Sequence, residues 1–188
     1  TNISGIIVQS PGLARIIKSL APNLPIHAST QMTIHSLSGA LEAKKLGFER
    51  IVLSRELSKE NIKHIVNNCG METECFIHGA LCMCYSGQCY MSSMIGTRSG
   101  NRGRCAQPCR LDFKSGEKNF CLSLKDMCYI EYVKKLSEAG VASLKIEGRM
   151  KRPEYAYMSS KTYKKAATSE NYKSDLNLLK SVFSRSGF

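Results

Sequence analysis

Cysteine is the residue type in this sequence with the clearest chemical potential, and its distribution is uneven. Eight of the nine cysteines fall in the segment from Cys75 to Cys128, and four of these follow a C-x6-C-x15-C-x3-C spacing. The four are Cys82, Cys89, Cys105 and Cys109. Zinc ribbons use two tight C-x2-C knuckles, whereas an iron-sulfur cluster is a larger object that loosely spaced thiolates can surround. The spacing therefore favours an iron-sulfur cluster, with zinc or no metal as alternatives and with Cys84 and Cys121 competing for one ligand position.

The remaining thiols fit a structural role. Cys69, Cys75 and Cys128 lie in apolar segments, where an uncharged thiol packs as a small hydrophobic group. An odd number of cysteines, most of them clustered, does not suit a disulfide framework, and no basic and apolar leader follows Thr1. We therefore expect a reducing, cytoplasmic environment.

Positive charge is concentrated in two segments of a chain whose net charge is +12. Residues 98–125 contain seven basic and two acidic residues, and residues 145–188 contain ten and four. The first segment overlaps the cysteines, so its arginines would lie near any cluster. These are Arg98, Arg102, Arg104 and Arg110. Such a localised basic region favours contact with RNA phosphates, although a solvated surface is the simpler alternative.

Short apolar runs alternate with amphipathic segments over most of the chain. The strands and helices that they predict must position the cysteines and arginines. Five strands are expected, in GIIVQS, PIHAST, RIVLS, ECFIHG and SLKIEG. The helices between them begin at caps such as Ser10 or end at Gly47, Gly70 and Gly140, the last helix spanning about 127–139. Alternating strands and helices predict an α/β fold with a parallel sheet, either open or part of a (β/α)8 TIM-like barrel that lacks its first strand-helix units.

The chain divides into four regions on this reading. Residues 1–78 form strand-helix units, 79–121 a cysteine-rich loop, 122–152 the last helix-strand unit and 153–188 a helical C-terminal segment. No run of apolar residues is long enough for a membrane span. The edges of an unclosed sheet could pair with a second copy, so a homo-oligomer is one possible assembly.

Polar residues follow several of the expected strands, where the active site of an α/β barrel lies. They are His27, Ser29, Gln31, Arg55, Glu56, His78, Lys145, Glu147 and Arg149. Each has a simpler explanation, such as an ion pair between Arg55 and Glu56 or between Glu147 and Arg149. Because alternate strand residues share a face, Lys145 and Glu147 are expected to point into the barrel, with Arg55 as the partner of this charge.

The cysteine-rich sequence ECFIHGALCMCYSGQCYMS, at Glu74 to Ser92, resembles the signature of the collagenase-like peptidase family. The flanking runs HASTQM, LSREL, LSLKDMC, SLKIEGRMK and VFSRSGF are similar to other motifs of this family. Members begin earlier and continue further, so the chain resembles an internal section of one.

This resemblance implies a barrel-like fold and, for one branch, oxygen-independent hydroxylation of RNA bases with a [4Fe-4S] cluster. SMIGTRSGNRGRCAQPCR looks closest to the branch that makes 5-hydroxycytidine in rRNA, with 5-hydroxyuridine formation in tRNA as its neighbour. By motif, the resemblance assigns Cys89, Cys105 and Cys109 as ligands, with Cys82 as the fourth and Cys84 as an extra thiol beside it. It further implies that His27, Arg55, Glu56, His78 and Glu147 are catalytic. A chorismate-pathway acid would be the hydroxyl donor, bound by Arg55 and Arg149, with Gln31 and Lys145 also contacting the substrate.

Two other functions remain open from the sequence. The family name implies a peptidase, which would need a nucleophile such as Cys82 or Cys84 activated by His78, and no G-x-S-x-G or H-E-x-x-H motif is present. A non-catalytic RNA-binding module would use the basic loops alone.

Overall fold

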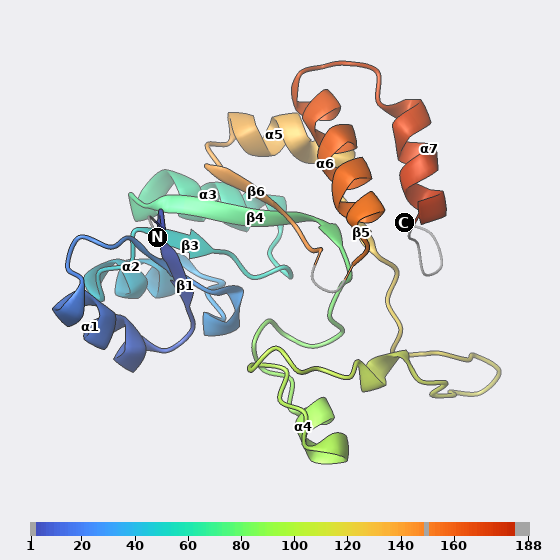
Figure 1. Cartoon of the computed structure of the whole chain (residues 1–188), viewed down its shortest axis with the longest axis horizontal. Helices are drawn as coiled ribbons and strands as arrows, with labels where there is room; N and C mark the ends of the chain where they lie inside the picture. Colours follow the sequence, from blue (N-terminus) through green and yellow to red (C-terminus); the bar gives the residue numbers. More distant parts are fainter. Residues whose placement is uncertain (1–2, 149–150, 183–188) are drawn as a thin grey trace.

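The computed structural model describes residues 3–148 and 151–182. They form an α/β sheet from which residues 80–126 project as a cysteine-rich lobe (Figure 1). The strands are β1 (Ile6–Val8), β2 (Ile26–Ala28), β3 (Arg50–Val52), β4 (Glu72–Gly79), β5 (Met127–Cys128) and β6 (Ser143–Ile146). The α-helices are α1 (Pro11–Leu20), α2 (Leu37–Lys45), α3 (Lys59–Cys69), α4 (Met91–Gly96), α5 (Val133–Glu138), α6 (Pro153–Ala167) and α7 (Lys173–Val182). Short 3-10 turns cover Thr30–Met32, Pro108–Arg110 and Ile130–Tyr132.

The sheet confirms the predicted α/β class and its parallel pairing. Strands β1, β2, β3 and β4 lie side by side in sequence order, and β6 pairs with β4, all in parallel. Each connection runs through a helix, and serine caps begin several of these helices: Ser10 accepts from the Leu13 N–H, and Ser58 from the Asn61 N–H. Parallel strands joined in this way bring their carboxyl ends to one edge. That edge is where the polar residues after β3 and β6 meet.

The helix expected over residues 127–139 is shorter than its apolar pattern suggested. Met127 and Cys128 instead form β5, which pairs antiparallel with His78 and Gly79 at the end of β4. A 3-10 turn follows, and α5 begins only at Val133. The local pattern could not show this, because the pairing partner of β5 lies about 50 residues earlier in the chain.

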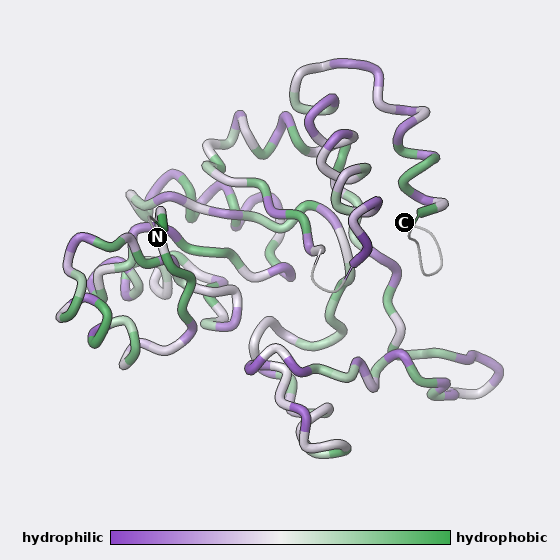
Figure 2. The backbone as a smooth tube through the Cα atoms, viewed as in Figure 1, coloured by the Kyte–Doolittle hydropathy of each residue, from purple (hydrophilic) through white to green (hydrophobic). Residues whose placement is uncertain are grey.

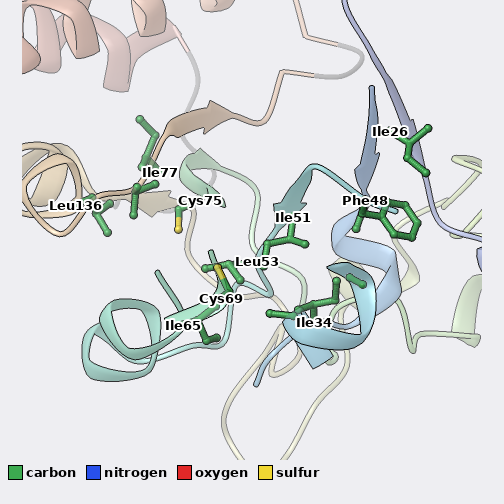
Figure 3. Close-up of a cluster of buried hydrophobic side chains, with 14 of the residues drawn as sticks. Ile26, Ile34, Phe48, Ile51, Leu53, Ile65, Cys69, Cys75, Ile77 and Leu136 are labelled. Atoms are coloured by element: carbon green, nitrogen blue, oxygen red, sulfur yellow. The ribbon is translucent and has the colours of Figure 1, made fainter. Parts of the chain in front are cut away.

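The main core lies between the sheet and helices α2, α3 and α5. Figure 3 shows branched aliphatic side chains such as Ile51, Leu53 and Ile65 gathered there with Cys69 and Cys75. Both thiols are buried, as predicted, and burial raises the pKa of Cys75 to about 12. Figure 2 shows the hydrophobic stretches along the strands, whereas the cysteine-rich lobe is mixed in character. None of the helices in the described ranges is long and apolar enough to cross a membrane.

Candidate functional site

Arg55 and Glu147 form the polar centre of the strand ends. Arg55 follows β3 and Glu147 follows β6, and the Nη2 atom of Arg55 lies 2.8 Å from Oε2 of Glu147. The other guanidinium nitrogen donates to the Ala80 carbonyl at 3.0 Å, and the ring of Phe76 stacks 3.9 Å from the guanidinium carbon. The predicted pairing of Arg55 with the charged residue after β6 is therefore confirmed. The Glu147 carboxylate is held in one orientation.

Glu56 does not pair with its neighbour Arg55 but anchors the cysteine-rich lobe. Its carboxylate accepts from the backbone N–H of Ser86 at 3.0 Å and from the Ser86 hydroxyl at 2.9 Å. A carboxylate that accepts two such bonds fixes the segment between Cys84 and Cys89 against the sheet.

Further contacts fasten the same lobe to the turn after β2. The Gln31 side chain donates to the Gly100 carbonyl at 3.3 Å, and Thr33 donates to the Ser86 carbonyl at 2.7 Å. Gly87 has a φ of +77°, and a Cβ there would lie 2.3 Å from the Gln31 carbonyl oxygen. Only glycine fits this approach. Gln31 therefore touches the lobe itself.

The four cysteines singled out by spacing face one cavity of about 170 Å³. It is lined by Cys82, Cys89, Cys105 and Cys109. Burial raises the pKa of the Cys109 thiol, an effect that the neighbouring Arg110 charge opposes. In residues 3–148 and 151–182, no three Cys, His, Asp or Glu side chains are close enough to bind a single metal ion. The donor set is nonetheless all thiol around one cavity, which fits a cluster whose ligands are spread around a larger object.

The two competing thiols, Cys84 and Cys121, differ in their position relative to these four. Cys84 lines a neighbouring cavity with Glu56 and Tyr85, and its pKa is raised by burial and by nearby Cys89 and Cys82. The Cys121 thiol donates to the Lys118 carbonyl at 3.1 Å in an exposed hairpin. Neither thiol lines the cavity of the four, but Cys84 lies beside Cys89 and Cys82, whereas Cys121 belongs to the hairpin.

An adjoining cavity of about 490 Å³ joins the thiols to the strand ends. Cys82, Cys105 and Cys109 line it from the lobe. Arg55, Glu147 and Lys151 line it from the sheet side. Lys151 was not singled out from the sequence, although it ends the SLKIEGRMK motif. A cavity of this volume falls within the usual range for small-molecule sites, and it brings acid, cation and thiol groups to one place.

Lys145 and His27 lie within strands β6 and β2, not at the strand ends. Lys145 donates to the Glu74 carboxylate at 2.6 Å, and Arg50 lies 3.6 Å from the same carboxylate. Burial opposes ionisation of Glu74, but the hydrogen bonds from Lys145 and Ser143 outweigh it and lower the Glu74 pKa. His27, aligned with Arg50 in the adjacent strand, has its pKa lowered by burial and by that charge. The structure does not bring these two to the rim.

His78 is also absent from the rim, contrary to our expectation. The side chain is fully buried, stacked on Tyr155 and within 3.2 Å of the Tyr163 hydroxyl at its Nδ1 atom. Burial lowers its pKa to about 4, so the imidazole is neutral at pH 7. The ring contacts Tyr155 and Tyr163 of α6, and the pairing of β4 with β6 shifts in register between Phe76 and His78.

The arginines of the lobe differ in their availability. Arg102 and Arg104 are exposed, and Arg98 is exposed while its Nε donates to the Arg104 carbonyl at 2.9 Å. Arg110 instead donates to the carbonyls of Leu81 and Leu124 and to the Ser123 hydroxyl. We predicted a phosphate contact for Arg110. Its side chain instead holds separate segments of the lobe together. Arg149 lies outside the described residues.

A parallel α/β sheet thus carries, beside its strand ends, a cavity lined by four thiols and an adjoining cavity lined by the Arg55–Glu147 pair. The model of Peptidase family U32 matches residues 1–185. The chain belongs to this family, which is the one that its motifs resemble.

Three curated relatives show the range of names within this similarity. The chain is 38% identical over 178 residues to "tRNA hydroxylation protein P1" of Bacillus subtilis, covering 87% of this chain and 42% of the relative. It is 42% identical over 164 residues to "23S rRNA 5-hydroxycytidine C2501 synthase" of Escherichia coli, covering 82% and 24%. It is 37% identical over 185 residues to "Collagenase" of Porphyromonas gingivalis, covering 87% and 44%. The chain thus spans less than half the length of these relatives.

Proposed function

We propose that this chain carries the active site of an RNA base hydroxylase that works without molecular oxygen and holds a [4Fe-4S] cluster. One observation carries the proposal: three of the four cavity-facing cysteines and the Arg55–Glu147 pair line the same cavity. The names of the tRNA- and rRNA-modifying relatives support RNA as the substrate. A four-thiol site also fits the reducing cytoplasm that we propose as its location.

Cys82, Cys89, Cys105 and Cys109 would hold the cluster, which when bound supplies one-electron redox chemistry next to the substrate. Arg55 orients Glu147, and Glu147 exchanges a proton with the base that enters the cavity. Arg55 and Lys151 provide the cations for a carboxylate co-substrate, and we keep a chorismate-pathway acid as the donor. Arg98, Arg102 and Arg104 hold the RNA backbone near the cavity.

The decisive experiment compares Cys105→Ser with Cys121→Ser after anaerobic purification. We expect Cys105→Ser to lose iron, sulfide and the visible charge-transfer absorbance, and to lose hydroxylated nucleosides from the RNA of cells that express it. Cys121→Ser should retain all of these, because its thiol lies in the separate hairpin. Full iron retention in Cys105→Ser, or peptide cleavage by the iron-free protein, would contradict the proposal.

A peptidase site is less well supported by the geometry. His78 is fully buried against α6, whereas Cys82 is exposed in the lobe. A thiol nucleophile needs its base within hydrogen-bond reach.

A further inference from the structure

A cavity of about 560 Å³ lies where the cysteine-rich lobe meets the sheet, and the proposed hydroxylation makes no use of it. Residues 81–86, from the first segment of the lobe, form one wall. Leu124 near the end of the lobe and Tyr129 after β5 form another, and Arg55 and Glu56 complete the lining after β3. The cavity is large enough to bind a molecule or part of one.

The accessible part of this wall is aromatic and aliphatic. Tyr85 is 71% exposed and Tyr129 is 39% exposed. Met83 and Leu124, which line the same cavity, are also exposed. Large apolar side chains that are exposed together are typical of a binding surface. The flat rings of the two tyrosines are suited to stacking on another flat ring.

The charged residues of the lining already have partners, so they do not require a charged ligand. Glu56 accepts two hydrogen bonds from Ser86, and Arg55 forms the ion pair with Glu147. Besides the thiols, the accessible surface that remains for a ligand in the described lining is uncharged. This surface favours an uncharged aromatic ring over a carboxylate or a phosphate.

The cavity adjoins the proposed reaction cavity of about 490 Å³. Arg55, Leu81 and Cys82 line both. In an RNA strand, the nucleotide next to the reacting one is covalently joined to it and must therefore occupy an adjoining space. Unpaired RNA bases are commonly bound by stacking on aromatic side chains. A cavity of roughly 150 Å³ holds benzene, so one of about 560 Å³ has room for a nucleobase with its ribose.

We propose that this cavity binds the base of the nucleotide next to the reacting one, stacked on the ring of Tyr85. Tyr129, Met83 and Leu124 form the rest of the base site. The inference rests on the proposed RNA hydroxylation and makes its substrate more specific. Because two neighbouring bases enter separate cavities, the substrate is a single-stranded segment of RNA.

A single tryptophan tests the stacking contact. The sequence contains no Trp, so Tyr85→Trp introduces the only indole, whose fluorescence a stacked base quenches. We expect saturable quenching by single-stranded oligocytidylate or oligouridylate. An abasic oligomer of the same length, which keeps the phosphates and lacks the bases, should not quench. Tyr157→Trp, at an exposed tyrosine of α6, is the matched control and should not respond to any of these oligomers.

Affinity measurements separate stacking from charge. Tyr85→Ala should weaken binding of the oligomer about tenfold, since stacking of one base on an aromatic ring typically contributes this much. Tyr85→Phe keeps the ring and should bind as tightly as the unchanged chain. The salt dependence of binding should be the same in Tyr85→Ala as in the unchanged chain, because no phosphate contact is removed.

The outcomes distinguish this site from the proposed function. Unchanged affinity in Tyr85→Ala, or equal quenching of Tyr85→Trp by the abasic oligomer, would overturn the base site and leave the RNA hydroxylation proposal standing. Failure of the unchanged chain to bind either oligomer would instead contradict RNA as the substrate, and the base site with it.

Discussion

Arg55 and Glu147 are 92 residues apart in sequence, yet their side chains form a 2.8 Å ion pair at the edge of the cavity that the cysteines also line. Both side chains are partly shielded from solvent, at 16% and 29% exposure. Such shielding strengthens the pair relative to a fully exposed one. The pair therefore fixes the position of a carboxylate beside the proposed substrate.

Glu147→Gln keeps the size of this side chain and removes its charge and its capacity to take up a proton. We expect at least a hundredfold loss of hydroxylated nucleoside, measured by mass spectrometry of digested cellular RNA, because positioned acid-base groups typically contribute that much. Iron content should stay unchanged, since Glu147 is not among the thiols. Glu154→Gln, an exposed change on α6, is the matched control. Normal hydroxylation in Glu147→Gln would remove this residue from the mechanism.

RNA binding should depend on salt through the exposed arginines of the lobe. Replacing Arg98, Arg102 and Arg104 together with Gln removes three phosphate contacts and should lower the slope of log affinity against log salt by about 2. Filter binding or fluorescence anisotropy at salt concentrations between roughly 50 and 200 mM measures this slope. The matched control replaces Lys59, Lys63 and Lys134, three exposed lysines outside the lobe. An identical slope in the arginine variant would exclude these phosphate contacts.

We expect Arg110→Gln to behave differently from the triple arginine variant, because the Arg110 side chain bonds to other segments of the lobe. Losing its hydrogen bonds to Leu81, Ser123 and Leu124 leaves carbonyls without a donor and should cost about 1 to 3 kcal/mol in unfolding free energy. Urea unfolding measures this loss, and iron content should fall in parallel because Cys109 is adjacent. If the variant weakened RNA binding with unchanged stability, Arg110 would be a surface contact after all.

His78 gives the fold an acid-sensitive element. Its folded-state pKa of about 4 lies below the ordinary value of 6.5, so the unfolded chain binds the extra proton first. The stability due to the neutral ring is fully present above pH 6.5 and is lost as the pH falls towards 4, by about 3 kcal/mol at most. Unfolding free energy measured at pH 7.0, 6.0 and 5.0 should decline, and His78→Gln should flatten the decline. His64→Gln, on the exposed side of α3, should not.

Local sequence signals were sufficient for the five parallel strands, and they singled out four thiols that line one cavity. Caps such as Ser10 and stops such as Gly70 act on neighbouring residues, so the strand-helix order could be predicted without tertiary information. The Arg55–Glu147 pair was also predictable, because parallel strands place the residues that follow them at one edge.

What the sequence did not reveal depends on contacts between distant segments. The clamp formed by Arg110 requires the carbonyl of Leu81, 29 residues earlier. The burial of His78 depends on Tyr155 and Tyr163 from α6 and on an irregularity in β4. Neither leaves a periodic signal near the residue concerned, so the sequence predicted a rim position for His78 and a phosphate contact for Arg110.

The close approach of Gly87 to Gln31 bears on what the cysteines do for the fold. The lobe is fastened to the sheet by peptide groups and by Glu56, none of which is a thiol. Small zinc domains, by contrast, depend on their metal to fold at all. Replacing a cysteine of the set of four by serine should therefore leave the attachment of the lobe to the sheet in place.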